Sequence, residues 1–191
     1  LGSSTPEEFE AILEDGAPQA ILQEKGRIRM VVSSDAVSSV SDYEEVITFW
    51  SGFHAKHSEL ASEPTSRMFE SHWIFDTQVG WGYANATSER ITYPKLSEVW
   101  ALRTQTGNED WWLFGHELGH QFQTSNWSGG DITEVAVNLF TMYTLNDYIH
   151  DGGNLETIGF NPNTIDHNEL ASYRWETADL FGKLQLYRQL I

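Results

Sequence analysis

The 191-residue chain contains no cysteine, so disulfide bonds, cysteine zinc ligands and thiol nucleophiles are all excluded. Basic residues are scarce: 11 Lys and Arg stand against 28 Asp and Glu, which gives a formal net charge of −17. Nucleic acids and anionic membrane surfaces bind proteins through basic patches, and neither is expected as a partner here. No segment approaches the roughly 18 consecutive apolar residues that a transmembrane helix needs.

What the chain does contain is an ordered series of strand-like and helix-like segments. Strands are expected at 27–32, 73–75 and 89–93, where β-branched and aromatic residues gather. Helices are expected at 6–15, 41–60, 97–103, 109–123, 131–148 and 177–191, several of them opened by capping residues such as Thr5, Ser41 and Asn108. The strands precede residue 95 and only helices follow it, which favours an α+β fold.

The length suits a single domain over residues 1–191. The last expected helix ends on the apolar Ile191 without a capping residue. We therefore expect this domain to be a fragment truncated at its C-terminal end, with the natural protein continuing beyond it.

Residues 116–120 read His-Glu-Leu-Gly-His, which is the H-E-x-x-H pattern. On a helix, His116 and His120 leave the same face, and their spacing lets both imidazoles bind one tetrahedral zinc ion. Glu117 is rotated by about 100° from His116, where it can reach a water on the metal as a general base. This arrangement is typical of metallopeptidases. The alternative is a buried, hydrogen-bonded histidine pair with no metal.

The rest of the motif helix fits this interpretation. Leu118 and Phe122 give the helix an apolar face distinct from the face of the two histidines. Gly119 lowers helix propensity, and we expect another backbone to lie close behind it to account for the glycine.

A catalytic zinc site usually has three protein ligands, and Glu134 is the candidate for the third. It lies in the first turn of the next expected helix, among apolar residues that predict a buried helix. A buried carboxylate needs a cation or several donors, and zinc supplies one. Asn138 lies one turn further on the same face, where its amide oxygen can accept the outer N–H of a ligand histidine, most simply His116. A helix-to-helix hydrogen bond unrelated to metal is an equal alternative for Asn138.

The remaining histidines carry weaker signals. His54 and His57 are spaced i, i+3 on an expected helix, but Lys56 between them and the lack of a third ligand favour a surface pair over a metal site. His72, His150 and His167 are isolated.

The sequence around the motif resembles a known family. The string GHELGHQFQ at 115–123, a tryptophan-containing loop and then TEVAVNLF at 133–140 are similar to the enhancin-type zinc metallopeptidases, which include viral enhancins and bacterial mucin-degrading proteases. The family signature is H-E-x-x-H followed after a gap by Glu, and the gap here is residues 121–133. The resemblance is clearest over residues 110–191.

The resemblance implies a single gluzincin-like catalytic domain of the α+β class, with a mixed sheet in the N-terminal half and the H-E-x-x-H and glutamate-bearing helices in the C-terminal half. It implies one zinc ion per chain, held by His116, His120 and Glu134, with Glu117 as the catalytic base. It also implies hydrolysis of peptide bonds in O-glycosylated, mucin-like proteins by a secreted or cell-surface enzyme of bacterial type. Attached carbohydrate-binding domains outside this chain fit the same resemblance.

Two other functions remain open. One is a zinc peptidase for unglycosylated peptides, and the other is a non-catalytic glycan-binding or adhesion module on the same fold. The intact Glu117 speaks against the second, since an inactive copy is free to lose its base.

Candidate substrate-binding residues lie in two aromatic segments. The glycine-aromatic region at 80–85 offers Trp81, Tyr83 and Asn85, and the loop between the two expected metal helices offers Trp127. Indole and phenol rings suit stacking on sugars, and an amide suits hydroxyl groups. The alternative is that Trp81 and Tyr83 are core residues, because large aromatic side chains are mostly buried.

Overall fold

The computed structural model describes residues 5–62, 69–79, 82–103, 111–125, 129–149 and Lys183. The α-helices are α1 (Pro6–Glu14), α2 (Ser34–Val37), α3 (Tyr43–Leu60), α4 (Glu98–Ala101), α5 (Trp111–Phe122) and α6 (Thr133–Thr144). Three further helical segments are η2 (Lys95–Ser97), η3 (Gly130–Ile132) and the π-helical η4 (Leu145–Ile149). The strands are β1 (Gln19–Glu24), β2 (Ile28–Ser33), β3 (Ser71–Asp76), β4 (Asn85–Ala86) and β5 (Arg90–Pro94).

The strands form one mixed sheet in the order β1-β2-β3-β5-β4. The pairs β1/β2 and β4/β5 are antiparallel, whereas β2/β3 and β3/β5 are parallel. The expected α+β fold, with its mixed sheet in the N-terminal half, is therefore confirmed. Strand β1 covers a short apolar segment to which the sequence assigned no element, and β4 is too short for a periodic signal.

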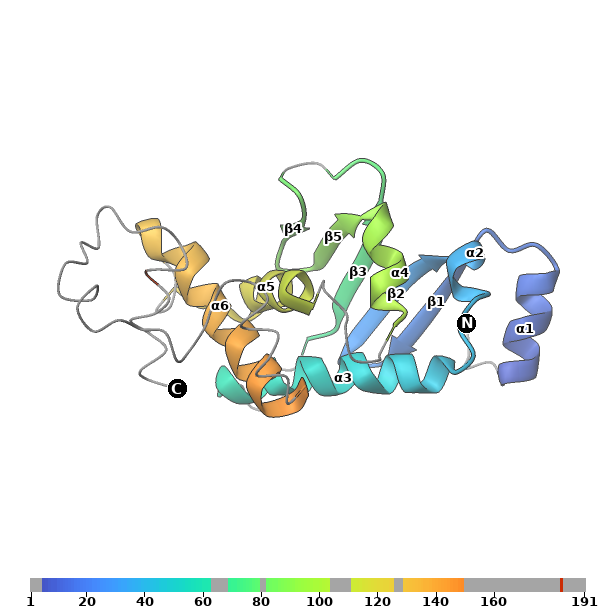
Figure 1. Cartoon of the computed structure of the whole chain (residues 1–191), viewed down its shortest axis with the longest axis horizontal. Helices are drawn as coiled ribbons and strands as arrows, with labels where there is room; N and C mark the ends of the chain where they lie inside the picture. Colours follow the sequence, from blue (N-terminus) through green and yellow to red (C-terminus); the bar gives the residue numbers. More distant parts are fainter. Residues whose placement is uncertain are drawn as a thin grey trace.

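One face of the sheet packs on the long helices (Figure 1). Met30, Trp73 and Ile91 are paired in register across β2, β3 and β5, and all three are fully buried. Their neighbours are aromatic: the ring of Trp73 lies 4.8 Å from Trp50 of α3 and is stacked on Phe114 of α5 at 5.3 Å. This aromatic core fixes α5, the helix of the H-E-x-x-H motif, against the sheet.

Helix ends follow the capping residues closely. Thr5 caps α1 in a complete capping box with Glu8, and Gly16 follows that helix with a φ of +83°, as expected of a glycine stop. Helix α3 is capped by Asp42, whose side chain accepts a hydrogen bond from the Glu45 N–H, so the expected cap at Ser41 is off by one residue. The expected start of the motif helix at 109 and the helix at 177–191 lie outside the described residues, apart from the helical Lys183.

Helices α5 and α6 approach each other through two glycines. A Cβ on Gly115 would lie 2.9 Å from a methyl carbon of Thr141, and a Cβ on Gly119 would lie 2.9 Å from the backbone oxygen of Val137. The expectation of a close backbone behind Gly119 is therefore confirmed. Leu118 and Phe122 are buried on the same helix, as expected. The absence of two side chains lets α6 lie directly against the motif helix.

The prediction that His54 and His57 form a surface pair is wrong, because both side chains are fully buried. Lys56 suggested an exposed helix face, but it projects in another direction from its two neighbours, toward Glu59 and Asp147. His54 packs against Phe122 at 5.0 Å between ring centroids, and the ring of His57 is stacked on Phe140. Periodicity placed these histidines on the helix but did not identify which face was covered.

None of the helices in the described ranges is long and apolar enough to cross a membrane.

Candidate metal centre

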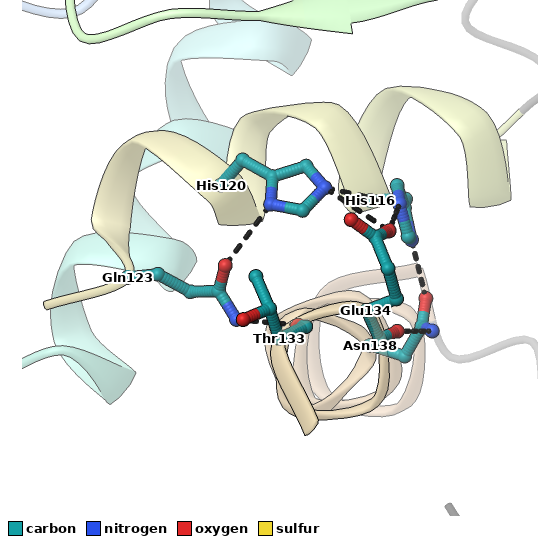
Figure 2. Close-up of polar contacts among 6 residues, drawn as sticks. All are labelled: His116, His120, Gln123, Thr133, Glu134 and Asn138. Atoms are coloured by element: carbon teal, nitrogen blue, oxygen red, sulfur yellow. Dashed lines mark hydrogen bonds and ion pairs between the residues drawn. The ribbon is translucent and has the colours of Figure 1, made fainter. Parts of the chain in front are cut away.

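Three side chains from two helices converge at the outer surface of α5 (Figure 2). Oε2 of Glu134 lies 3.1 Å from Nε2 of His116 and 3.4 Å from Nε2 of His120, and the two histidine nitrogens are 3.2 Å apart. Ligand atoms about 2.0–2.1 Å from a tetrahedral zinc ion would lie about 3.3 Å from one another. The triangle formed by these three atoms therefore has the size of one face of a zinc coordination tetrahedron.

The hydrogen bond expected between Asn138 and His116 is present. Nδ2 of Asn138 donates to the backbone carbonyl of Glu134 at 2.8 Å, and Oδ1 lies 2.8 Å from Nδ1 of His116. A carbonyl can only accept, so the amide nitrogen must face Glu134 and the amide oxygen must face the histidine. Nδ1 of His116 therefore carries a proton and donates it to Asn138.

This tautomer makes the triangle suitable for a cation. Burial is the main cause that lowers the pKa of His116, which favours its neutral form. Neutral His116 with its proton on Nδ1 presents a bare Nε2 to Glu134 and His120. Lone pairs that face one another without a proton between them repel, and a divalent ion bound by nitrogen and oxygen ligands removes that repulsion.

Glu117 lies beside the triangle but is not part of it. Its side chain is buried, with 7% of its surface exposed. Burial, followed by the negative charge of Glu134, raises the pKa of Glu117 to about 7. A carboxyl group whose pKa lies near neutrality can both take and return a proton, which is what a general acid–base residue must do. A cation bound close by would lower that pKa again and favour the carboxylate.

The expectation that the Glu134 side chain is buried is wrong. The helix around it is buried, as expected, but the Glu134 side chain itself is 60% exposed. It lies in the first turn of α6, on the side that faces the two histidines rather than the core. Its proximity to His116 and His120, and not burial, is what singles it out as a candidate ligand.

Gln123 is a polar neighbour of the triangle that the sequence argument missed. Its Oε1 lies 3.0 Å from Nδ1 of His120, and its Nε2 donates to the backbone carbonyl of Thr133 at 2.8 Å. The available signal was its spacing, three residues after His120, which places the two side chains on neighbouring positions of a helical turn.

The candidate substrate residues are only partly described. Tyr83 is 67% exposed, so it is not a core residue. Asn85 lies on β4, the last strand of the sheet, which contacts α5. Trp81 and Trp127 lie outside the described residues.

The two histidines of α5 and Glu134 of α6 form a group that could hold one metal ion, beside a buried carboxyl group of raised pKa. The sequence profile of the family described as Peptidase M60, enhancin and enhancin-like matches residues 1–190. The chain belongs to this family.

Three individual proteins are also similar to the chain. The chain is 30% identical over 124 residues, 61% of its length, to the TRPM8 channel-associated factor homolog of Xenopus laevis. It is similar over its whole length to the crystal structure of a functionally unknown conserved protein from Bacillus anthracis, with a TM-score of 0.77 and 17% identity. It is also similar, over 74% of its length, to a metallopeptidase in complex with Tn antigen, with a TM-score of 0.63 and 18% identity.

The chain spans only part of each relative. It covers 13% of the Xenopus protein, 41% of the Bacillus protein and 27% of the metallopeptidase bound to Tn antigen. At these levels of identity the solved structures show the shared fold, so activity, substrate and partners are matters for proposal.

Proposed function

We propose that this chain carries the catalytic site of a zinc endopeptidase that hydrolyses peptide bonds in O-glycosylated, mucin-like proteins. The observation that carries the proposal is the triangle of His116, His120 and Glu134, whose edges of 3.1, 3.2 and 3.4 Å suit one zinc ion. A gluzincin-like arrangement, with two ligands from the motif helix and one from the next helix, agrees with membership of the M60 family.

In this proposal one zinc ion per chain is held by His116, His120 and Glu134. Zinc at this position supplies a Lewis acid that acidifies water and polarises the scissile carbonyl. Asn138 holds the ring of His116 with Nε2 directed at the metal position.

Glu117 is the general base. It lies on α5 next to His116, and its buried carboxylate takes the proton of the attacking water at a carboxylate oxygen. It then passes the proton to the nitrogen of the departing amine, since the same group that is a base in the first step is an acid in the second. The proposed base is the reason for preferring an endopeptidase to a structural zinc site, which has no use for such a carboxyl group.

The peptide is proposed to lie along the edge of β4 that pairs with no strand in the described residues. Strand β4 ends the described sheet and contacts α5, and Nε2 of Gln121 of α5 donates to the carbonyl of Thr87, the residue after β4. An extended peptide can add to such an edge through backbone hydrogen bonds. Tyr83 and Asn85, at or next to β4, are then placed for contact with a sugar or with the peptide, and Trp81 and Trp127 are proposed to extend this surface.

The preference for glycosylated substrates is supported by the neighbour solved with Tn antigen, a finding that concerns that protein. It agrees with the exposed ring of Tyr83, which is free to stack on a sugar. A secreted or cell-surface location, and carbohydrate-binding domains elsewhere in the natural protein, belong to the same proposal and rest on resemblance to the family.

A second candidate is a non-catalytic binding module. It is supported by the Xenopus relative, whose name refers to association with a channel rather than to catalysis. The presence of Glu117 between the two histidines favours the enzyme.

The test compares one peptide with and without a single GalNAc on Ser or Thr, incubated with the zinc-loaded protein and followed by mass spectrometry. We expect cleavage of the glycopeptide at a much higher kcat/KM. Equal values for the two peptides would leave an ordinary zinc endopeptidase, and binding of the glycopeptide without cleavage would favour the module.

A further inference from the structure

Both histidines of the triangle have a side-chain amide on their outer nitrogen. Asn138 faces Nδ1 of His116 from α6, and Gln123 faces Nδ1 of His120 from the end of α5 (Figure 2). The two amides differ in origin, since Asn138 comes from the partner helix whereas Gln123 follows its own histidine by three residues. The hydrogen bonds of both amides nevertheless reach the first turn of α6.

Each amide uses its nitrogen to bind a backbone carbonyl in the first turn of α6. Nδ2 of Asn138 donates to the carbonyl of Glu134, and Nε2 of Gln123 donates to the carbonyl of Thr133, both at 2.8 Å. Thr133 and Glu134 are the first two residues of α6. The two histidines are thus connected to adjacent peptide groups of the segment that carries the third candidate ligand.

The Thr133 bond also determines which tautomer a neutral His120 adopts. Because the Thr133 carbonyl can only accept, the amide nitrogen of Gln123 must face it, and Oε1 of Gln123 must face the histidine. The only complementary group is an N–H on Nδ1 of His120, at 3.0 Å. In the neutral imidazole this leaves Nε2 of His120 bare and directed at His116 and Glu134.

We propose that Gln123 is a positioning residue that orients His120 toward the metal and couples it to the start of α6. This inference rests on the proposed zinc site. With Gln123 in place, a rotation of the His120 ring breaks the Nδ1 bond, and a displacement of α6 breaks the Thr133 bond. The outer partner of a ligand histidine fixes its tautomer and ring orientation, and its loss typically weakens metal binding by about 10–100-fold.

Gln123 has a suitable matched control in Gln121. Both are glutamines at the end of the motif helix, but the side chain of Gln121 binds Ser71 and the Thr87 carbonyl on the sheet side rather than either histidine. Gln123→Leu removes both hydrogen bonds at similar volume. Gln123→Glu keeps an acceptor for His120 and removes the donor for Thr133.

Zinc affinity is measured by competition with a chromophoric chelator for the wild type, Gln123→Leu, Gln123→Glu and Gln121→Leu, each first checked for its fold by circular dichroism. We expect Gln123→Leu to weaken zinc binding about 10–100-fold. Gln123→Glu should recover most of that loss, and Gln121→Leu should match the wild type. Equal zinc affinity in Gln123→Leu and the wild type, or no recovery in Gln123→Glu, would overturn the assignment.

A second readout does not depend on metal. In the metal-free protein, long-range ¹H–¹⁵N correlation spectra report which nitrogen of His120 is protonated, and we expect Nδ1–H in the wild type and a mixture in Gln123→Leu. The same tautomer distribution in both proteins would overturn the positioning role even if the wild type bound no zinc. Zinc binding by the wild type with no effect of Gln123 would instead leave the proposed function intact and remove only this inference.

Discussion

Two histidine pairs on two helices of this protein have opposite surroundings. His116 and His120 of α5, here called the outer pair, keep 16% and 20% of their side-chain surface exposed, and Nδ1 of each meets a side-chain amide oxygen. His54 and His57 of α3 are fully buried among aromatic rings, including Phe69, Phe122 and Phe140. The comparison shows that helical spacing brings two imidazoles to one side of a helix in both cases, whereas the neighbouring groups decide whether they can serve a metal.

The buried pair lacks what the outer pair has. Within the described residues, neither ring nitrogen of His54 makes a well-formed hydrogen bond, and no carboxylate completes a ligand set there. The nitrogens of His57 are used internally, 3.0 Å from the Gly115 carbonyl and 2.9 Å from the Thr144 hydroxyl. His57 thus joins α3 to both helices of the candidate metal centre without contributing to it.

The largest expected effect tests whether the pair His116 and His120 binds zinc whereas the pair His54 and His57 does not. His120→Ala removes one of three candidate ligands, so it should abolish stoichiometric zinc, a greater loss than the roughly 10–100-fold typical of an outer partner. His54→Leu, the control from the buried pair, should keep one zinc ion per chain. Elemental analysis after dialysis measures both, and full occupancy in His120→Ala would remove this site from consideration.

The second prediction separates metal binding by His116 and His120 from the proton transfer assigned to Glu117. Glu117→Gln should retain zinc, since Glu117 is outside the triangle, but its amide cannot take a proton from water. We expect kcat for peptide cleavage to fall by about 10²–10⁴-fold. Cleavage at a near wild-type rate, measured by mass spectrometry with zinc content confirmed, would show that another group is the base.

The third prediction concerns the packing that brings Glu134 to the outer pair. A methyl group at Gly119 would meet both the side chain and the backbone oxygen of Val137 at less than 3 Å. Gly119→Ala should therefore destabilise the fold by about 1–3 kcal/mol through overpacking and weaken zinc binding by moving α6.

Gly129→Ala is the matched control, because no described atom lies within 4 Å of a Cβ at that position and its φ of −178° suits any residue. Urea denaturation of the metal-free variants compares the two. If both substitutions have the same effect on the midpoint, close helix packing is not the reason for Gly119.

Much of the fold was predictable because its signals are local. The capping box at Thr5, the glycine stop at Gly16 and the β-branched strand 27–32 depend on a few neighbouring residues, and each marks an element that the structure contains. Strand β4 was not predictable, because two residues, Asn85 and Ala86, carry no periodic pattern and their pairing with β5 is set by the chain on both sides.

The candidate metal centre likewise has features that local sequence predicts and features that depend on how the helices pack. The spacing of His116 and His120 follows from the helix alone, and the amide of Asn138 could be placed because it lies one turn from Glu134. The exposure of Glu134 and the fully buried state of His54 and His57 could not be inferred, since both depend on how α3, α5 and α6 pack together. Lys56 was misleading because successive residues of a helix point about 100° apart, so an exposed residue between two others says little about the face on which those two lie.

The smallest expected effect concerns the buried pair, His54 and His57, and the pH dependence of stability that it causes. Burial lowers the pKa of His54 to about 3 and that of His57 to about 4, from an ordinary value of 6.5. Below pH 6.5 the unfolded chain binds protons that the folded protein does not, so the free energy of unfolding falls as the pH falls from 6.5 toward 4. Each such histidine costs up to about 1.4 kcal/mol per pH unit over this range.

His54→Leu removes one of the two contributions and fills the same aromatic pocket with an apolar side chain. The metal-free variant should therefore lose less stability than the wild type between pH 7 and pH 4.5, a difference of about 2–3 kcal/mol at the lower pH. His72→Gln is the control for the loss of a histidine outside the aromatic pocket, since the His72 side chain is 44% exposed. Urea midpoints at four or five pH values measure the curves, and parallel curves for His54→Leu and the wild type would show that His54 is protonated as easily in the folded protein as in the unfolded chain.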